Sequence, residues 1–290
     1  AEGLKGRLYR TAWLYLGSEA CAVDAVDEAV YQGFLHYKRL RQPEYFATWM
    51  TRILINACNA ELRRRKRENA AQYPLVTACL AAADRLLAPA RAMWEEPRCR
   101  RDLEELAGCL ALTALRPSGR QGRVRRRFLS AVTPEGLSFC TETAAAVCGR
   151  VYVLEDSYGL APALLQRVLE QALQLGQTCL VCYTPLQPDG APAHLLVPGA
   201  GAAFVASSPD FPYAGERCCT LELDGTLPPA ARDTLHFARD TAGTLLRKAA
   251  EHVREAKRIH DELEALCRPY VDFAAADALT ERTLHELFPA

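Results

Sequence analysis

The chain has 290 residues, of which 50% are hydrophobic and 24% are charged, so it can bury a core and is not a disordered tail. Its 35 basic and 35 acidic side chains cancel, which excludes a globally basic nucleic-acid binder and requires any such site to come from local clustering. Neither a secretory leader nor an apolar run long enough for a bilayer is visible, so we expect a cytoplasmic protein without a membrane partner.

The first part of the chain predicts helices only. Apolar residues recur at helical spacing from Leu4 to Tyr15, and Ser18 is placed to cap a second helix. That helix has an apolar pattern and an acidic face: Val23, Val26, Val30 and Phe34, against Asp24, Asp27 and Glu28. We expect a bundle of three to four helices over residues 1–70.

The third predicted helix is "PEYFATWMTRILINACNAELRRRKR", residues 43–67, with a proline suited to the first turn. An apolar stripe for packing consists of Phe46, Met50, Ile53, Ala57 and Ala60. A neighbouring stripe carries rings, amides and arginines: Tyr45, Trp49, Arg52, Asn56, Asn59 and Arg63. The helix then closes on five cations: Arg63, Arg64, Arg65, Lys66 and Arg67.

Two interpretations of this helix remain open. The cations can lie along phosphates and release counterions, while rings and amides stack on or hydrogen-bond unpaired bases. Alternatively, a basic helix end complements the helix dipole, and Trp49 fills a core. We favour nucleic acid for the cation run, and the core for Trp49 taken alone.

The middle of the chain predicts connections. Residues 68–77 look like a linker ending at Pro74, and the stretch 71–122 is expected to be a helical linker. "RPSGRQGRVRRRF", residues 116–128, contains glycine and many arginines, and we interpret it as a basic hinge at the domain boundary.

Beyond the hinge the hydrophobic period changes. Residues 150–183 predict a strand, a loop, a helix from about Ala161 to Leu175 and a second strand, which is a βαβ unit. "GAAFVASS" supplies another strand, and a long charged helix is expected from Pro228 to about Cys267, followed by a further helix. The one C-x-x-C, Cys179 and Cys182, has no partner pair at zinc spacing and is best explained as buried thiols.

Residues 4–67 resemble region two of bacterial extracytoplasmic-function (ECF) sigma factors, the RNA polymerase subunits that open promoters. The family pattern D-A-x-D-A-x-Q-E is met by Asp24, Ala25, Val26 and Glu28, whereas Cys21 and Asp27 depart from it. The "TW-x-x-x-I-x-x-N" signature is met by Thr48, Trp49, Ile53 and Asn56. The trailing run of cations is met as well.

The resemblance implies a transcription initiation protein that binds the RNA polymerase core through the β′ clamp helices and melts the minus-ten promoter DNA. It implies polymerase contacts at Asp24, Asp27 and Glu28. It implies DNA contacts at Lys38, Arg39, Arg41, Tyr45, Trp49, Arg52, Asn56, Asn59, Arg63, Arg64, Arg65, Lys66 and Arg67. No enzyme activity is expected, no region four is recognisable after Arg67, and an anti-sigma factor or another protein is a further candidate partner.

Residues 81–290 resemble, more loosely, the C-terminal half of an uncharacterised family of bacterial P-loop ATPases. The phosphate-binding positions are altered, with Asp156, Ala161, Pro162 and Ala163 in place of Gly, Gly, Lys and Ser/Thr, so no nucleotide, cofactor or metal site is expected. The expected fold is mainly α with an α/β part, a degenerate P-loop-like domain at 123–290 with long C-terminal helices. The alternative function is a non-catalytic scaffold or nucleotide-gated regulator.

Overall fold

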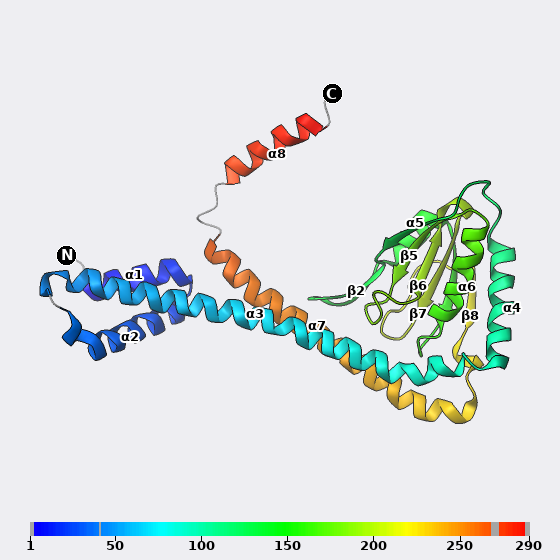
Figure 1. Cartoon of the computed structure of the whole chain (residues 1–290), viewed down its shortest axis with the longest axis horizontal. Helices are drawn as coiled ribbons and strands as arrows, with labels where there is room; N and C mark the ends of the chain where they lie inside the picture. The colour runs from blue at the N-terminus through cyan, green and yellow to red at the C-terminus, as the bar shows by residue number, and fades with distance from the viewer. Residues whose placement is uncertain (1–2, 41, 268–272, 288–290) are drawn as a thin grey trace. The chain divides into compact units, whose positions relative to one another are not determined.

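The computed structural model describes residues 3–40, 42–267 and 273–287. The chain divides into two compact units (Figure 1): unit 1 comprises residues 1–71 and 256–290, and unit 2 comprises residues 72–255. Helices predominate and unit 2 contains a mixed six-stranded sheet, so the expectation of a mainly α fold with an α/β part is confirmed at that level. Within the described residues, no helix combines the length and apolar character that crossing a bilayer requires.

Unit 1 is built from helices. Its elements are α1 (Leu4–Leu16), α2 (Glu19–His36), the short 3-10 turns Tyr37–Arg39 and Pro43–Tyr45, the first part of α3 (Phe46–Met93), the end of α7 (Pro229–Cys267) and α8 (Phe273–Leu287). Gly17 closes α1 in the left-handed conformation. Ser18 is the N-cap residue of α2 as predicted, although its side chain makes no capping hydrogen bond.

The core of unit 1 uses a different stripe of α3 from the one that the sequence suggested. The buried α3 residues are Met50, Leu54 and Cys58, one helical turn apart, and they pack on small residues of α2 and on α1. Phe46, which was expected in this stripe, is 44% exposed. Trp49, Ile53 and Leu62 pack against this row in partly buried positions, and α2 presents mainly alanines to it.

The linker expected around Pro74 is wrong, because α3 continues through this proline without interruption. An internal proline removes a backbone hydrogen bond and costs about 3 kcal/mol. Contacts with α7 occur on both sides of it. In unit 1 the Asn69 amide donates to the Ala256 carbonyl at 2.5 Å, and in unit 2 Gln72 Oε1 lies 2.8 Å from His252 Nδ1. We infer that packing against α7 offsets the cost of Pro74.

The sheet of unit 2 has the strand order β1-β5-β6-β7-β4-β8. Its strands are β1 (Arg123–Arg127), β4 (Arg150–Glu155), β5 (Thr178–Tyr183), β6 (Pro192–Val197), β7 (Ala202–Ser207) and β8 (Cys219–Glu222). β6 is antiparallel to both neighbours, and the other pairings are parallel. The predicted strand–helix–strand is confirmed as β4, α6 (Ala161–Gln174) and β5, although β6 and β7 lie between the two strands.

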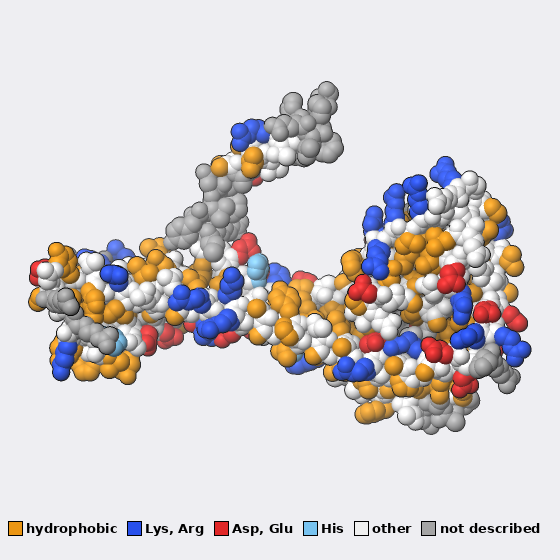
Figure 2. Space-filling model, in the orientation of Figure 1, with side chains coloured by type: hydrophobic (Ala, Val, Ile, Leu, Met, Phe, Trp, Pro, Cys, Tyr) orange, Lys and Arg blue, Asp and Glu red, His pale blue; other side chains and the backbone are white. Residues whose placement is uncertain are grey.

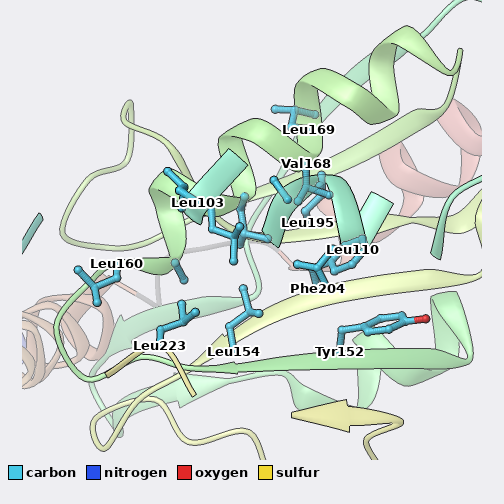
Figure 3. Close-up of a cluster of buried hydrophobic side chains, with 14 of the residues drawn as sticks. Leu103, Leu110, Tyr152, Leu154, Leu160, Val168, Leu169, Leu195, Phe204 and Leu223 are labelled. Carbon is cyan, nitrogen blue, oxygen red and sulfur yellow. The ribbon is translucent and has the colours of Figure 1, made fainter. Parts of the chain in front are cut away.

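Both faces of this sheet are covered. On one face α6 and α4 (Pro97–Ala114) form the main core with the central strands, and Figure 3 shows Leu103 and Leu110 of α4 together with Phe204 of β7. On the other face lie α5 (Thr141–Cys148) and the hairpin of β2 (Ser130–Thr133) and β3 (Gly136–Phe139). The stretch 71–122, expected to be a linker, therefore supplies α4 to the core of unit 2.

The basic stretch 116–128 is not a hinge. Its arginine-rich part forms β1, which pairs in parallel with β5 at the edge of the sheet. The chain before β1 is bound to the turn after α6, since Ser118 N donates to the Leu175 carbonyl at 2.9 Å. This strand was not predicted from the sequence, because its exposed arginines do not alternate with apolar residues.

The turn at Gly176 provides a test of this packing. Gly176 has φ +74°, and a Cβ there would lie 2.0 Å from the backbone oxygen of Arg120. We expect Gly176→Ala to destabilise unit 2 by roughly 2 kcal/mol or more. Gly108→Ala, a control on α4 with open space around the added methyl, should stabilise by about 0.5–1 kcal/mol. Urea unfolding followed by the fluorescence of the buried Trp94 measures both, and equal effects would contradict the prediction.

Candidate functional site

The five consecutive cations of α3 are not equivalent. Arg63, Lys66 and Arg67 are exposed and line a shallow groove on α3 together with Ala60 and Ala70. Among the described residues, these three cations have no ion-pair partner. Their charges are therefore available to an anion from solution.

The charge of Arg64 is offset locally. Its guanidinium makes two hydrogen bonds to the Glu61 carboxylate, both 2.7 Å long, and a further ion pair with Glu68. The hydrogen bonds that Arg64 donates to Glu61 raise the pKa of Arg64, and the hydrogen bonds that Glu61 accepts from Arg64 and Arg65 lower the pKa of Glu61. Two carboxylates compete with any external phosphate for this side chain.

Arg65 points into unit 1 and is 8% exposed. Its Nε donates to Glu61 Oε1 at 3.0 Å, and its Nη2 donates to the Cys21 sulfur at 2.8 Å. Its Nη1 lies 3.8 Å from a carboxylate oxygen of Glu262 in α7. Cys21 is one of the positions at which the sequence departs from the ECF pattern. The structure thus separates Arg65 from the exposed cations, and its environment is that of a residue joining three helices.

A groove between α2 and α3 brings together residues that the sequence had assigned to two partners. Its walls include Asp24, Glu28, Gln32 and His36 from α2, and Asn56, Ala60, Glu61, Arg64 and Arg67 from α3. Asp27 is exposed but does not line the groove. The groove therefore has an acidic wall and a wall of mixed charge.

The other predicted contact residues lie around the start of α3. Tyr45, Arg52 and Lys38 are exposed, whereas Asn59 is half-buried. Trp49 is half-buried against the core of unit 1, and its ring centroid lies 6.2 Å from that of Phe46. Arg41 lies outside the described residues, as does the side chain of Arg39.

The helix α2 carries an exposed apolar patch that the sequence pattern did not indicate. Three of the four residues expected to follow one apolar pattern are exposed: Val23 by 43%, Val30 by 51% and Phe34 by 72%. Tyr31 and Leu35 extend the patch. Small residues of α2, such as Ala22 and Ala29, occupy the core instead. Exposed apolar patches of this kind commonly mark protein contacts.

In unit 2, a carboxylate in the loop between β4 and α6 accepts hydrogen bonds from the backbone of the same loop. Asp156 is 5% exposed, and its Oδ1 accepts hydrogen bonds from the backbone N–H groups of Tyr158 at 3.2 Å and Leu160 at 2.8 Å. Its Oδ2 accepts from the N–H of Ala161 at 2.8 Å. Burial raises the pKa of Asp156, against the opposing effect of these donors. The N–H groups that a phosphate would need at the start of α6 are thus already used.

A cavity of about 90 Å³ beside this loop contains a serine–histidine pair. Ser130 Oγ lies 3.3 Å from His194 Nε2, and both side chains are buried. Burial lowers the pKa of His194 to about 3, so the imidazole is neutral and a weak base at neutral pH. Its Nδ1 has no hydrogen-bond partner among the described residues, so no carboxylate orients the ring. This pair lacks the features of an activated nucleophile.

Because Arg65 is buried and Arg64 is not, we expect substitutions at these two neighbouring positions to change the stability of unit 1 unequally. Arg65→Ala should destabilise unit 1 by roughly 2 kcal/mol, because it removes the side chain that joins α3 to α2. Arg64→Ala, at a half-exposed ion pair, should change stability by about 0.5 kcal/mol or less. Hydrogen exchange of peptides from α2 in the full chain measures the difference. Equal protection in the two variants would contradict this role of Arg65.

Because His194 is buried in its neutral form, we expect unit 2 to lose stability in acid. Because its pKa falls from 6.5 to about 3 on folding, the unfolded state binds a proton that the folded state does not between these pH values. Stability should therefore fall as the pH drops from 6.5 towards 3, by up to a few kcal/mol at about 1.4 kcal/mol per pKa unit. His194→Gln should flatten this dependence.

The measurement is urea unfolding from pH 4 to 7, followed by Trp94 fluorescence with Trp13 and Trp49 changed to Phe in both chains. Comparing the two chains isolates His194 from Asp156, whose raised pKa acts in the opposite direction. Parallel curves for the chain that keeps His194 and the chain that carries His194→Gln would show that another group causes the dependence.

Comparison with known proteins gives one assignment. No curated protein and no solved structure was found to match the chain. These comparisons lend no support to the expected likeness of residues 81–290 to P-loop ATPases. Residues 1–68, which include α1, α2 and the cation run of α3, match the family model of sigma-70 region 2, a module of transcription initiation.

Proposed function

We propose that this protein is a sigma-like transcription initiation factor that binds the RNA polymerase core and minus-ten promoter DNA through unit 1. The observation that carries the proposal is the match of residues 1–68 to sigma-70 region 2. The exposed cations of α3 and the exposed amide of Asn56 support a nucleic-acid contact, and the exposed apolar patch of α2 supports a protein contact. The two surfaces belong to different helices, so one module can hold both partners.

We assign the DNA contact to the exposed side chains of α3 and the turns before it. These are Lys38, Tyr45, Arg52, Asn56, Arg63, Lys66 and Arg67, with the half-buried Trp49 and Asn59 beside them. Cations fix the position of the strand on the protein, and rings and amides contact the bases. Arg65 is left out because it is buried, and Arg64 is a weaker candidate because two glutamates bind it.

We assign the polymerase contact to α2. Its exposed apolar patch offers the area that a protein partner would bury, and Asp24, Asp27 and Glu28 are exposed charged residues along the same helix. Phe34, the most exposed of the patch at 72%, is the side chain whose loss should matter most. The partner expected here is the β′ clamp helices of the polymerase.

For unit 2, the alternative of a nucleotide-gated regulator is disfavoured by the Asp156 carboxylate, which already accepts the N–H donors of its loop. A non-catalytic accessory role is the alternative that this geometry favours. No region four is recognisable between Arg67 and Ala290, so the proposal is limited to the contacts of unit 1 with the polymerase core and the minus-ten element.

Two paired variants of the full chain test the proposal with core RNA polymerase and a minus-ten bubble carrying 2-aminopurine. Arg63→Glu with Lys66→Glu should retain polymerase binding but reduce the binding of bubble DNA by roughly tenfold or more, because two phosphate contacts become repulsive. Phe34→Glu should abolish polymerase capture. The control, Lys5→Glu with Arg7→Glu on exposed positions of α1, carries the same change of charge and should behave as the parent chain.

Binding of the bubble by the parent chain should raise the 2-aminopurine fluorescence, and this rise should become smaller as the salt concentration increases. Failure of the parent chain to capture polymerase would sink the proposal and leave residues 1–68 as a remnant of the family. Loss of DNA binding in the α1 control to the same extent would show a non-specific effect of net charge.

A further inference from the structure

The edge strand β1 of unit 2 carries a second concentration of arginine. All five side chains of this RVRRR strand are exposed. Arg123, Arg125 and Arg127 lie on one face at intervals of roughly 6.6 Å, as residues two apart in a strand must. Figure 2 shows a row of basic side chains along the upper edge of unit 2, and the sheet order places β1 at the edge next to β5.

Acidic side chains hardly compensate this charge. Residues 116–128 contain six arginines and no acidic residue. Arg126 lies on the opposite face from the other three, with its guanidinium 4.7 Å from the ring centroid of Tyr183 and Nη1 3.4 Å from Asp189. That pair is exposed on both sides and contributes little. Within the part of the chain that the structure describes, Arg123 and Arg125 have no ion-pair partner.

An exposed aromatic ring follows the arginines directly. Phe128 is 78% exposed, although the next residue, Leu129, is buried in the core on one face of the sheet. The packing of unit 2 therefore gives no reason for a phenyl ring at this position. By the alternation of the strand, Phe128 falls on the face of Arg126 and not on that of the other three arginines, but both faces adjoin the same open edge because β1 is the edge strand. Cations along one edge with an exposed ring beside them are the elements with which proteins hold unpaired nucleic-acid strands.

We propose that β1 and Phe128 form a second nucleic-acid site that takes a single strand, with Arg123, Arg125 and Arg127 on successive phosphates and Phe128 stacked on a base. The interval of the arginines is close to the separation of successive phosphates on one extended strand. The site is separate from the sigma region 2 match and does not depend on the function proposed for unit 1.

Edge protection and peptide binding account for β1 less completely. Charged residues protect sheet edges from aggregation, but such protection does not require an exposed ring beside them. An acidic peptide could instead add to the open edge as a further strand. That partner would use the backbone of β1 and would leave Phe128 without a role, so nucleic acid is favoured and the peptide becomes an outcome of the test.

The test measures binding of fluorescein-labelled oligo-thymidylate to the full chain by anisotropy, between about 50 and 200 mM salt. All chains carry Arg63→Glu and Lys66→Glu, so that the contribution of unit 1 is reduced and is the same in every comparison. Adding Arg123→Ala and Arg125→Ala should weaken binding by roughly tenfold and lower the slope of log affinity against log salt by about 1.4. Phe128→Ala should weaken binding by roughly tenfold at all salt concentrations.

Matched variants keep the result interpretable. Arg100→Ala with Arg101→Ala, on exposed positions of α4 in the same unit, should leave the slope unchanged. Arg123→Lys with Arg125→Lys should restore it, which excludes a folding defect. The proposal is overturned if the α4 control loses as much affinity, if duplex DNA binds as well as the single strand, or if a glutamate-rich peptide displaces the oligonucleotide and Phe128→Ala has no effect. A failure of polymerase capture by unit 1 would leave this result untouched.

Discussion

The fold of unit 2 depends on burying its central strands from both sides. Every residue of β6 is buried, and β7 is nearly as deeply covered, so α4 with α6 and α5 with the β2–β3 hairpin must close both faces. The edges of the sheet are formed by β1 and β8. β1 occupies one of these edges, and this position is why its five side chains can all be charged or exposed without loss of core.

Unit 1 carries five consecutive cations on one helix, α3. Helical geometry distributes them around α3, so one guanidinium becomes buried and shared among three helices, one is bound by two glutamates, and three remain exposed. The stretch that looks uniform in sequence thus separates into a structural residue, an internally compensated residue and a usable anion surface. Counting cations in the sequence overestimates that surface.

Local pattern predicted the strand–helix–strand of unit 2, the long helix α7 and the existence of α1 and α2, because each has a clear period or punctuation. The course of α3 through Pro74 was not predictable, since its compensation comes from residues of α7 that are 180 and 187 positions from their partners in α3. The burial of Arg65 could have been predicted from spacing, because Arg65 shares one helical face with the core residues Leu54 and Cys58. Its place within a run of five cations indicated an exposed residue instead. The closed loop of Asp156 and the pairing of Ser130 with His194 required the tertiary fold.

Unit 2 is inserted within unit 1, since residues 72–255 separate the two segments from which unit 1 is made. During synthesis, α1, α2 and the start of α3 leave the ribosome long before the end of α7. The acceptors that α7 offers to Asn69 and Arg65 arrive only after the whole sheet has been translated. The core of α1, α2 and α3 contains no described residue of α7, so what α7 adds late is this set of polar contacts at the surface of the bundle. Unit 1 is therefore completed by contacts that join the two ends of the chain, with the sheet translated between them.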